Sequence, residues 1–271
     1  MADEKRIGFI GGGMMAEAMI KGIVAKGIVP PDMIYVSDHK AARADYLSDA
    51  YGVNASVGAS GFIEMMDVVV LAVKPQAIEK AMDEVGGKVK EDAIIVSIVA
   101  GITIGTIEKK FMGHLVVRVM PNTPLAVGAG MSAYSLSDES SGDREELVAE
   151  LLSAGGKAVK VKESMMDAVT GLSGSGPAYG FLVIDALSDG GVAAGLPRAT
   201  ARLLAAQTML GAAQMVLATG EHPDVLRDQV TSPAGTTIAG VRLLEEKGVR
   251  GALIDAVIAA SERSSELGRI K

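Results

Sequence analysis

A glycine-rich turn follows the first apolar run of the chain and has the spacing of a dinucleotide-binding fingerprint. Residues 7–10 lead directly into Gly11-Gly12-Gly13-Met14-Met15-Ala16, and a helix-like segment covers residues 17–26. In such a turn the first glycine permits a tight bend, the second motif glycine lets the backbone approach a pyrophosphate, and the alanine allows close helix packing. The helix N-terminus adds amide donors and a favourable dipole. The pattern therefore predicts binding of a nicotinamide dinucleotide by Gly11, Gly13, Met14 and Met15.

A second group of candidates stands where the second predicted strand ends, the place at which such a domain contacts the adenosine ribose. Asp38 could bind the ribose hydroxyls of NAD and repel a 2′-phosphate. Its neighbours could instead bind the 2′-phosphate of NADP: Ser37, His39, Lys40 and Arg43. In the alternative interpretation, Asp38 caps a helix and the basic residues are solvated charges. We take Ser37 and Lys40 as cofactor-binding candidates, with NADP as the expected cofactor and NAD as the alternative.

Loops after three further predicted strands are expected to line the same groove, because ligands of open α/β sheets lie outside the carboxyl ends of the strands. Their candidate residues are Ala72, Val73 and Lys74 at the end of the fourth strand, Ala100 and Gly101 after the fifth, and Asn122 after the sixth. From residue type alone, Lys74 is a solvated charge and Asn122 a turn residue beside prolines. Their position at strand ends favours the groove.

The elements that must position these residues alternate between short β-branched runs and helix-length segments up to about residue 161. Strands are predicted at 7–10, 33–37, 53–56, 68–73, 94–98 and 115–120, with a further one at 158–161. Continuous Val, Ile and Leu content indicates burial on both faces of the sheet. The fold class is therefore α/β, with an N-terminal Rossmann doubly wound sheet that we assign to residues 1–162.

From about residue 164 onward β-branched runs disappear, and alanine, leucine and methionine dominate. Breaks between helices are predicted at 195–197, 220–223, 232–233 and 247–248. The segments 181–187 and 203–217 carry few charges on any face, so a single copy could not keep them from water. Residues 163–271 are therefore predicted to be an all-helical dimerisation and substrate domain that a partner subunit covers.

Composition narrows the classes of partner and chemistry. The net charge of −7 argues against nucleic acid and anionic membranes as partners, and no transmembrane helix is expected. Cysteine is absent, which excludes disulfides and thiolate chemistry and suits a reducing compartment, so a cytoplasmic location is expected. The three histidines form no ligand cluster, and no metal site is expected.

Several motifs in order resemble the pyrroline-5-carboxylate reductase family over nearly the whole chain. The N-terminal motifs are 8–18 (GFIGGGMMAEA), 72–76 (AVKPQ) and 118–124 (RVMPNTP). The C-terminal motifs are 170–179 (TGLSGSGPAY), 189–192 (DGGV), 195–198 (GLPR) and 230–238 (VTSPAGTTI). The first motif is common to many dehydrogenases, whereas the last is close to family-specific.

The resemblance implies reduction of the cyclic imine 1-pyrroline-5-carboxylate to L-proline, with hydride passing from the nicotinamide to the imine carbon. In the family, the threonine matching Thr237 contacts the ring nitrogen, and the loop matching Ser232, Gly235 and Thr236 holds the substrate carboxylate. A carboxylate at a helix start is physically reasonable. In the alternative interpretation, residues 231–233 only cap that helix. Family members also form homodimers through the helical part, often assembled into rings of dimers, and complete each site across the dimer.

Two other enzyme families and a non-catalytic role are the alternatives. β-Hydroxyacid dehydrogenases carry a G-x-x-G-x-G-x-x-x-K-x-x-x-N motif, and this chain matches its glycines but has Gly180 for the lysine and Ile184 for the asparagine. Their carbonyl chemistry needs that lysine to handle the alcohol proton, so an imine is favoured over an alcohol. An F420-dependent reductase would share only the glycine fingerprint, and a dinucleotide-sensing scaffold would have no use for residues 232–237.

Overall fold

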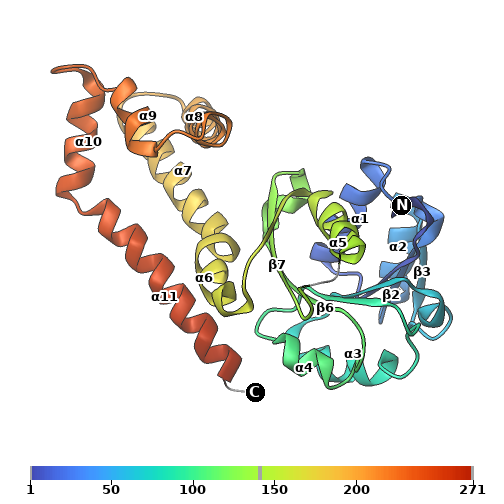
Figure 1. Cartoon of the computed structure of the whole chain (residues 1–271). Helices are drawn as coiled ribbons and strands as arrows, with labels where there is room; N and C mark the ends of the chain where they lie inside the picture. Colours follow the sequence, from blue (N-terminus) through green and yellow to red (C-terminus); the bar gives the residue numbers. More distant parts are fainter. Residues whose placement is uncertain (1, 140–141, 270–271) are drawn as a thin grey trace. The chain divides into compact units, whose positions relative to one another are not determined.

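The computed structural model of the protein describes residues 2–139 and 142–269 (Figure 1). Internal contacts divide the chain into two units. The first unit comprises the residues up to Gly174 together with those from Ala260 onward, and the second comprises Ser175–Ala259. The first holds a sheet with helices and the second is helical, which confirms the predicted fold class. The domain boundary between residues 162 and 163 stays a prediction.

Within the described residues, one mixed sheet of eight strands has the order β3-β2-β1-β4-β5-β6-β7-β8, and only β6 and β7 pair antiparallel. The bounds are β1 Ile7–Ile10, β2 Ile34–Asp38, β3 Asn54–Val57, β4 Val68–Leu71, β5 Ile94–Ser97, β6 Val116–Pro121, β7 Gly130–Leu136 and β8 Gly156–Lys160. The chain runs outward from β1 to β3 and returns to β4 on the other side of β1. The strand order therefore reverses between β1 and β4, and ligands of such sheets bind at that point.

Helices cover both faces of the sheet, because successive strand residues point to opposite sides. In β4, Val68 and Val70 belong to one hydrophobic core, whereas Val69 and Leu71 belong to the other. The first core draws on α1 (Met14–Ala25), α2 (Ala41–Tyr51) and α5 (Asp143–Ser153), and the second on α3 (Ile78–Val85) and α4 (Ile104–Glu108). Burial on both faces is the doubly wound arrangement that the sequence predicts.

Strand β7 is absent from the sequence-based prediction. It runs antiparallel to β6, with Tyr134 opposite Val119, and carries β8 at its other edge. Its sequence, GMSAYSL, mixes small, polar and aromatic residues with one methionine and one leucine and contains no β-branched residue. The pattern therefore carries no strand signal of its own. The remaining predicted strands are confirmed, with shifts of at most two residues at their ends.

The second unit contains α7 (Gly176–Ala193), α8 (Arg198–Thr219), α9 (Pro223–Gln229), α10 (Thr236–Glu246) and the first part of α11 (Val249–Arg269). The four breaks between these helices lie where the sequence predicts them. Large apolar side chains are exposed on these helices, including Phe181 at 65%, Leu182 at 69% and Leu203 at 70%. Among the described residues no single helix is both long and apolar enough to cross a membrane, and only α8 with α9, bent by 118°, meets these criteria as a pair.

Candidate functional site

The turn after β1 is shaped by the close approach of Gly11 to the end of β4. Gly11 has a φ of +104°, and a Cβ there would lie 2.6 Å from the carbonyl oxygen of Ala72. The Gly11 amide donates to the carbonyl of Ser37 at 2.8 Å, and the Ala72 amide donates to that of Ile10 at 2.9 Å. Both conformation and space therefore require glycine at this position.

Gly13 and the first turn of α1 face open space. A Cβ on Gly13 would meet no protein atom within 4 Å, and no side chain caps the helix that begins at Met14. An α-helix leaves its first amides without intrahelical acceptors, so those of Met14 and Met15 are available to an anion. Ala16 is fully buried and lets α1 pack closely on the sheet. These features fit a bound pyrophosphate.

A cavity of about 570 Å³ opens beside this turn, a volume typical of small-molecule sites. The residues singled out in the sequence that line it are Gly11, Ser37, Asp38, His39 and Val73. Further lining residues, which the sequence analysis did not single out, are Val57, Gly58, Ala77, Lys80, Ala81 and Glu84. Val57 and Gly58 follow the third strand, so the rule of strand ends could have found them. The sequence gives no signal for the lining residues on α3, because their position at the cavity depends on how α3 packs against the sheet.

The candidates at the end of β2 and just beyond it differ in their surroundings. Ser37 is buried, and its hydroxyl donates to the carbonyl of Phe9 at 3.5 Å. Lys40 is exposed and is itself the N-cap residue of α2. The interpretation of Asp38 as that cap is wrong, because its carboxylate accepts the amides of Gly12 at 3.1 Å and of Lys40 at 3.0 Å.

Arg43 is also not a solvated charge. Its Nε donates to the carbonyl of Gly12 at 2.6 Å, and its guanidinium forms an ion pair with Glu17 of α1. Glu17 accepts two further hydrogen bonds, from Tyr46 at 2.9 Å and Tyr51 at 2.8 Å. Burial disfavours the Glu17 carboxylate, but the bonds from Arg43 and the two tyrosines outweigh this effect and lower its pKa below 4.5. Burial and the bond to Glu17 raise the pKa of Tyr51.

The loops after β4 and β5 leave their candidates at or near the surface: Lys74, Ala100 and Gly101. Asn122, after β6, is bonded within the protein. Its Oδ1 accepts the Met131 amide at 2.8 Å, and its Nδ2 donates to the carbonyl of Ser173 at 3.2 Å. Ser173 belongs to a π-helical turn, Thr170–Gly174, a rare form that is common at functional sites. Asn122 thus joins β6, β7 and this turn, and its contact with a cofactor stays a prediction.

A strained turn precedes α10 in the second unit. The Gly235 amide donates to the carbonyl of Ser232 at 3.1 Å, and a Cβ on Gly235 would collide with the Ser232 hydroxyl. Ala234 has a φ of +56°, a conformation that costs energy in a residue other than glycine and clusters at ligand sites. The predicted residues Ser232, Gly235, Thr236 and Thr237 are therefore grouped at one turn.

Residues 231–233 do not cap α10. The Thr231 hydroxyl donates instead to the carbonyl of Arg227 in α9, at 2.6 Å. Gly235 is the N-cap residue and offers no side chain, so the first amides of this 11-residue helix are available to an anion. Thr237 is half-buried and lies one residue beyond the helix start.

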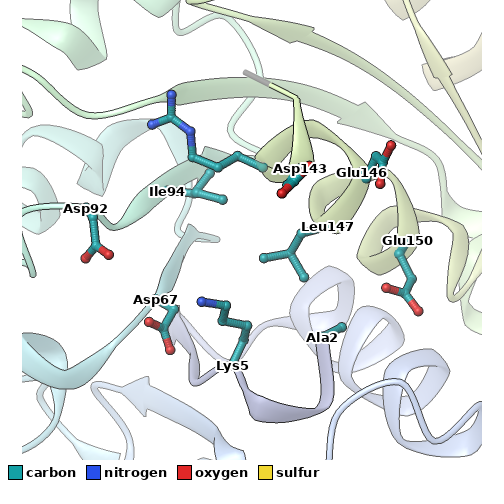
Figure 2. Close-up of a pocket in the computed structure, with 10 residues that line it drawn as sticks. Ala2, Lys5, Asp67, Asp92, Ile94, Asp143, Glu146, Leu147 and Glu150 are labelled. Carbon is teal, nitrogen blue, oxygen red and sulfur yellow. The ribbon is translucent and has the colours of Figure 1, made fainter. Parts of the chain in front are cut away.

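A second cavity, of about 580 Å³, lies at the opposite end of the strands, where they begin, and its lining is acidic (Figure 2). It lies by the residues that precede β1, β4 and β5 and by the start of α5. Carboxylates dominate its charged lining: Asp67, Asp92, Asp143, Glu146 and Glu150, against Lys5 and Arg144. Such a lining repels phosphate groups, so this cavity is not the dinucleotide site. In the described ranges, no cluster of side chains could hold a metal ion.

Two family models match the chain. Residues 163–267 match the model described as pyrroline-5-carboxylate reductase dimerisation. Residues 6–101 match the model described as NADP oxidoreductase, coenzyme F420-dependent. The first match covers the helices and the turn before α10, and the second covers the glycine turn and the strands up to β5.

Relatives and solved structures match nearly the whole chain. A pyrroline-5-carboxylate reductase of Arabidopsis thaliana is 48% identical over 99% of this chain and 97% of its own length. The structure of a pyrroline-5-carboxylate reductase from Coxiella burnetii has a TM-score of 0.92 at 36% identity, over 97% of this chain and 98% of that one. The Plasmodium falciparum pyrroline carboxylate reductase, solved with NADP bound, has a TM-score of 0.86 at 29% identity, over 99% of this chain and 100% of that one.

The lowered pKa of Glu17 predicts a pH-dependent contribution to stability. A carboxyl group whose pKa is lowered by folding stabilises the protein above its unfolded pKa, near 4.5, and loses this effect as the pH falls through the folded value. Near neutral pH, Glu17→Gln should lower the free energy of unfolding by about 1–2 kcal/mol, as expected for weakened bonds to a charged group. The difference from wild type should shrink steadily below pH 4.5.

Urea unfolding at a series of pH values, at one protein concentration, measures this difference. The control is Glu64→Gln, which removes an exposed carboxylate in the short helix Ile63–Met65. A Glu17→Gln deficit that stayed constant into acid would contradict the assignment.

Proposed function

This chain belongs to the pyrroline-5-carboxylate reductase family, and we propose that it reduces 1-pyrroline-5-carboxylate to L-proline with a nicotinamide dinucleotide. The observation that carries the proposal is the identity of 48% over 99% of the chain, which takes in both the glycine turn and the turn before α10. A likeness restricted to the glycine turn would support only dinucleotide binding.

The proposed reaction needs little acid–base chemistry from the protein. Hydride adds to the imine carbon, the C=N bond becomes a single bond, and the nitrogen of the protonated imine becomes the amine. A protonated imine is already electrophilic, so the protein must supply position, a hydrogen bond to the ring nitrogen and a seat for the carboxylate. The absence of histidine from the turn before α10 is consistent with this requirement.

We assign the substrate to the turn before α10. The first amides of α10, together with Ser232, Gly235 and Thr236, would hold the carboxylate, because the helix N-terminus is uncapped and attracts anions. The Thr237 hydroxyl would bond to the ring nitrogen. The backbone strain at Ala234 supports a functional role for this turn.

The cofactor assigned to the groove at the ends of β1 and β4 is NADP, with NAD as the alternative. When bound in its reduced form, NADPH or NADH, it would supply the hydride. Gly11, Gly13, Met14 and Met15 would hold its pyrophosphate, since Gly13 leaves open space and the first amides of α1 are available. The other residues assigned to it are Ser37, Lys40, Ala72, Val73, Lys74, Ala100, Gly101 and Asn122.

A homodimer, assembled further into a ring of dimers, and a cytoplasmic location belong to the same proposal. The exposed apolar side chains of α7 and α8 need a partner surface, and the family match over residues 163–267 concerns dimerisation. A chain without cysteine suits a reducing compartment.

The purified protein should oxidise NADPH or NADH when 1-pyrroline-5-carboxylate is added, and should turn over 3-hydroxy acids with NADP or NAD at least about a hundredfold more slowly. The reason is that position 180 is glycine, so the lysine that hydroxyacid dehydrogenases need is missing. Absorbance at the nicotinamide band measures both rates. Hydroxyacid oxidation without imine reduction would refute the proposal, as would reduction that runs only with F420.

Thr237→Ala should lower kcat about ten- to a hundredfold and leave the Kd of the dinucleotide nearly unchanged. One hydrogen bond to a charged group contributes about 1.5–3 kcal/mol, which corresponds to that range. Thr237→Ser keeps the hydroxyl and should recover most of the rate. Thr219→Ala is the control, because this hydroxyl bonds to the Met215 carbonyl within α8. An unaltered kcat in Thr237→Ala would remove this residue from the mechanism.

Mixed dimers should test whether each site is completed by two subunits. Gly13→Asp places a carboxylate where a pyrophosphate is expected, so its homodimer should be nearly inactive. Thr237→Ala removes the contact to the imine, so its homodimer should be slow. If the groove of one subunit works with the turn of the other, verified heterodimers should regain roughly half of the wild-type rate, since one of their two sites is intact. No recovery in such heterodimers, or full activity in a monomer, would contradict a shared site.

A further inference from the structure

The peptide groups on both sides of Gly12 are held by charged side chains of the second βα unit. The Gly12 amide donates to Asp38 Oδ2 at 3.1 Å, and the Gly12 carbonyl accepts from Arg43 Nε at 2.6 Å. Gly12 is buried, and a Cβ there would lie 2.8 Å from a methyl group of Leu47. The middle glycine of the turn is therefore fixed by two hydrogen bonds to charged groups and by close packing.

Arg43 is held in this position by its own contacts. Its guanidinium pairs with Glu17 and lies 5.1 Å from the centre of the Tyr46 ring. Tyr46 and Tyr51 both donate to Glu17, which fixes the carboxylate between the two tyrosines and the guanidinium. The side chain of Arg43 is only 25% exposed. This network connects α1 with α2 through the peptide of Gly12.

Asp38 is likewise held by contacts within the protein. Its Oδ1 accepts the Lys40 amide at 3.0 Å and lies 3.2 Å from His39 Nδ1, and its side chain is 11% exposed. The Asp38 carboxylate thus accepts hydrogen bonds from two backbone amides of the protein itself, those of Gly12 and Lys40. Asp38 at the end of β2 and Arg43 of α2 have opposite expected preferences for NAD and NADP, and both are engaged in holding the glycine turn.

We propose that Asp38 and Arg43 are positioning residues that hold the Gly12 peptides and so direct the amides at the start of α1 toward the pyrophosphate, and that they do not select between NADH and NADPH. This inference rests on the proposed function, because it concerns the dinucleotide assigned to the groove. The pyrophosphate is common to both dinucleotides. Disturbing the turn should therefore weaken both to the same extent.

Charge-conserving substitutions separate this role from recognition of the ribose. Arg43→Lys keeps the positive charge, but an ammonium cannot reproduce the planar fork that joins the Gly12 carbonyl to Glu17. Asp38→Glu keeps the negative charge and displaces the carboxylate by one methylene. The control is Arg144→Lys on α5, in the lining of the acidic cavity at the opposite end of the strands.

Titration calorimetry of the full-length protein with NADH and with NADPH measures the four dissociation constants of the two variants. Each should rise about tenfold, the loss expected when a hydrogen bond to a charged group is weakened. The ratio of the NADH and NADPH constants should stay within about twofold of wild type. Turnover at saturating dinucleotide and imine should remain near wild type, so the effect appears in KM and not in kcat. Circular dichroism at the titration temperature establishes that each variant is folded.

Selective results would overturn the inference. A loss of NADPH binding alone in Arg43→Lys would place this residue on the 2′-phosphate, and a loss of NADH binding alone in Asp38→Glu would place that one on the ribose hydroxyls. Unchanged constants in both folded variants would also refute it. If one variant does not fold, the dissociation constants of the other variant test the inference.

The same titrations separate this inference from the function on which it rests. A wild-type protein that binds neither dinucleotide refutes both. A wild-type protein that binds both but does not reduce the imine refutes the proposed function, and a parallel loss in the variants would still support the positioning role.

Discussion

The left-handed turn at Gly11, pressed against the carbonyl of Ala72, is the constraint on which the dinucleotide end of the protein depends. Strands β1 and β4 are parallel neighbours at the point where the strand order reverses, and their ends approach so closely that no Cβ fits between them. Because the chain bends there at once, only three residues separate the end of β1 from the start of α1, whose first amides face open space and whose Ala16 packs against the sheet. The groove is thus a consequence of one backbone conformation.

A turn this tight buries peptide groups that neither helix nor sheet can satisfy. A buried amide or carbonyl without a partner costs about 1–3 kcal/mol, so the groups of Gly12 need partners from elsewhere in the chain. The second βα unit supplies them as charged side chains, Asp38 and Arg43. Their charges are in turn compensated by the bonds to Glu17 and to backbone amides. The second βα unit therefore supports the glycine turn and also borders the proposed adenosine side of the groove.

The sequence predicts those parts of the fold that depend on local pattern. Six parallel strands and four helix breaks are recognisable because β-branched runs, glycines and prolines report backbone preference directly. Strand β7 was missed because its small and polar residues owe their extended form to pairing with β6. The roles of Asp38 and Arg43 were open for a similar reason. Whether a charged side chain faces a ligand or the next backbone turn depends on side-chain packing, which spacing along the chain does not record.

The turn before α10 illustrates the same distinction within the second unit. Its helices could be predicted, but the backbone strain at Ala234 could not, since alanine carries no preference for a positive φ. Such a conformation persists only where surrounding contacts enforce it, and here the Ser232 carbonyl and the close packing of Ser232 on Gly235 do so. The amides of α10 and those of α1 are therefore presented by the same device: a strained, glycine-dependent turn that leads into a helix without a side-chain cap. Both helix N-termini can therefore attract an anion, which in the proposed function would be the pyrophosphate at α1 and the substrate carboxylate at α10.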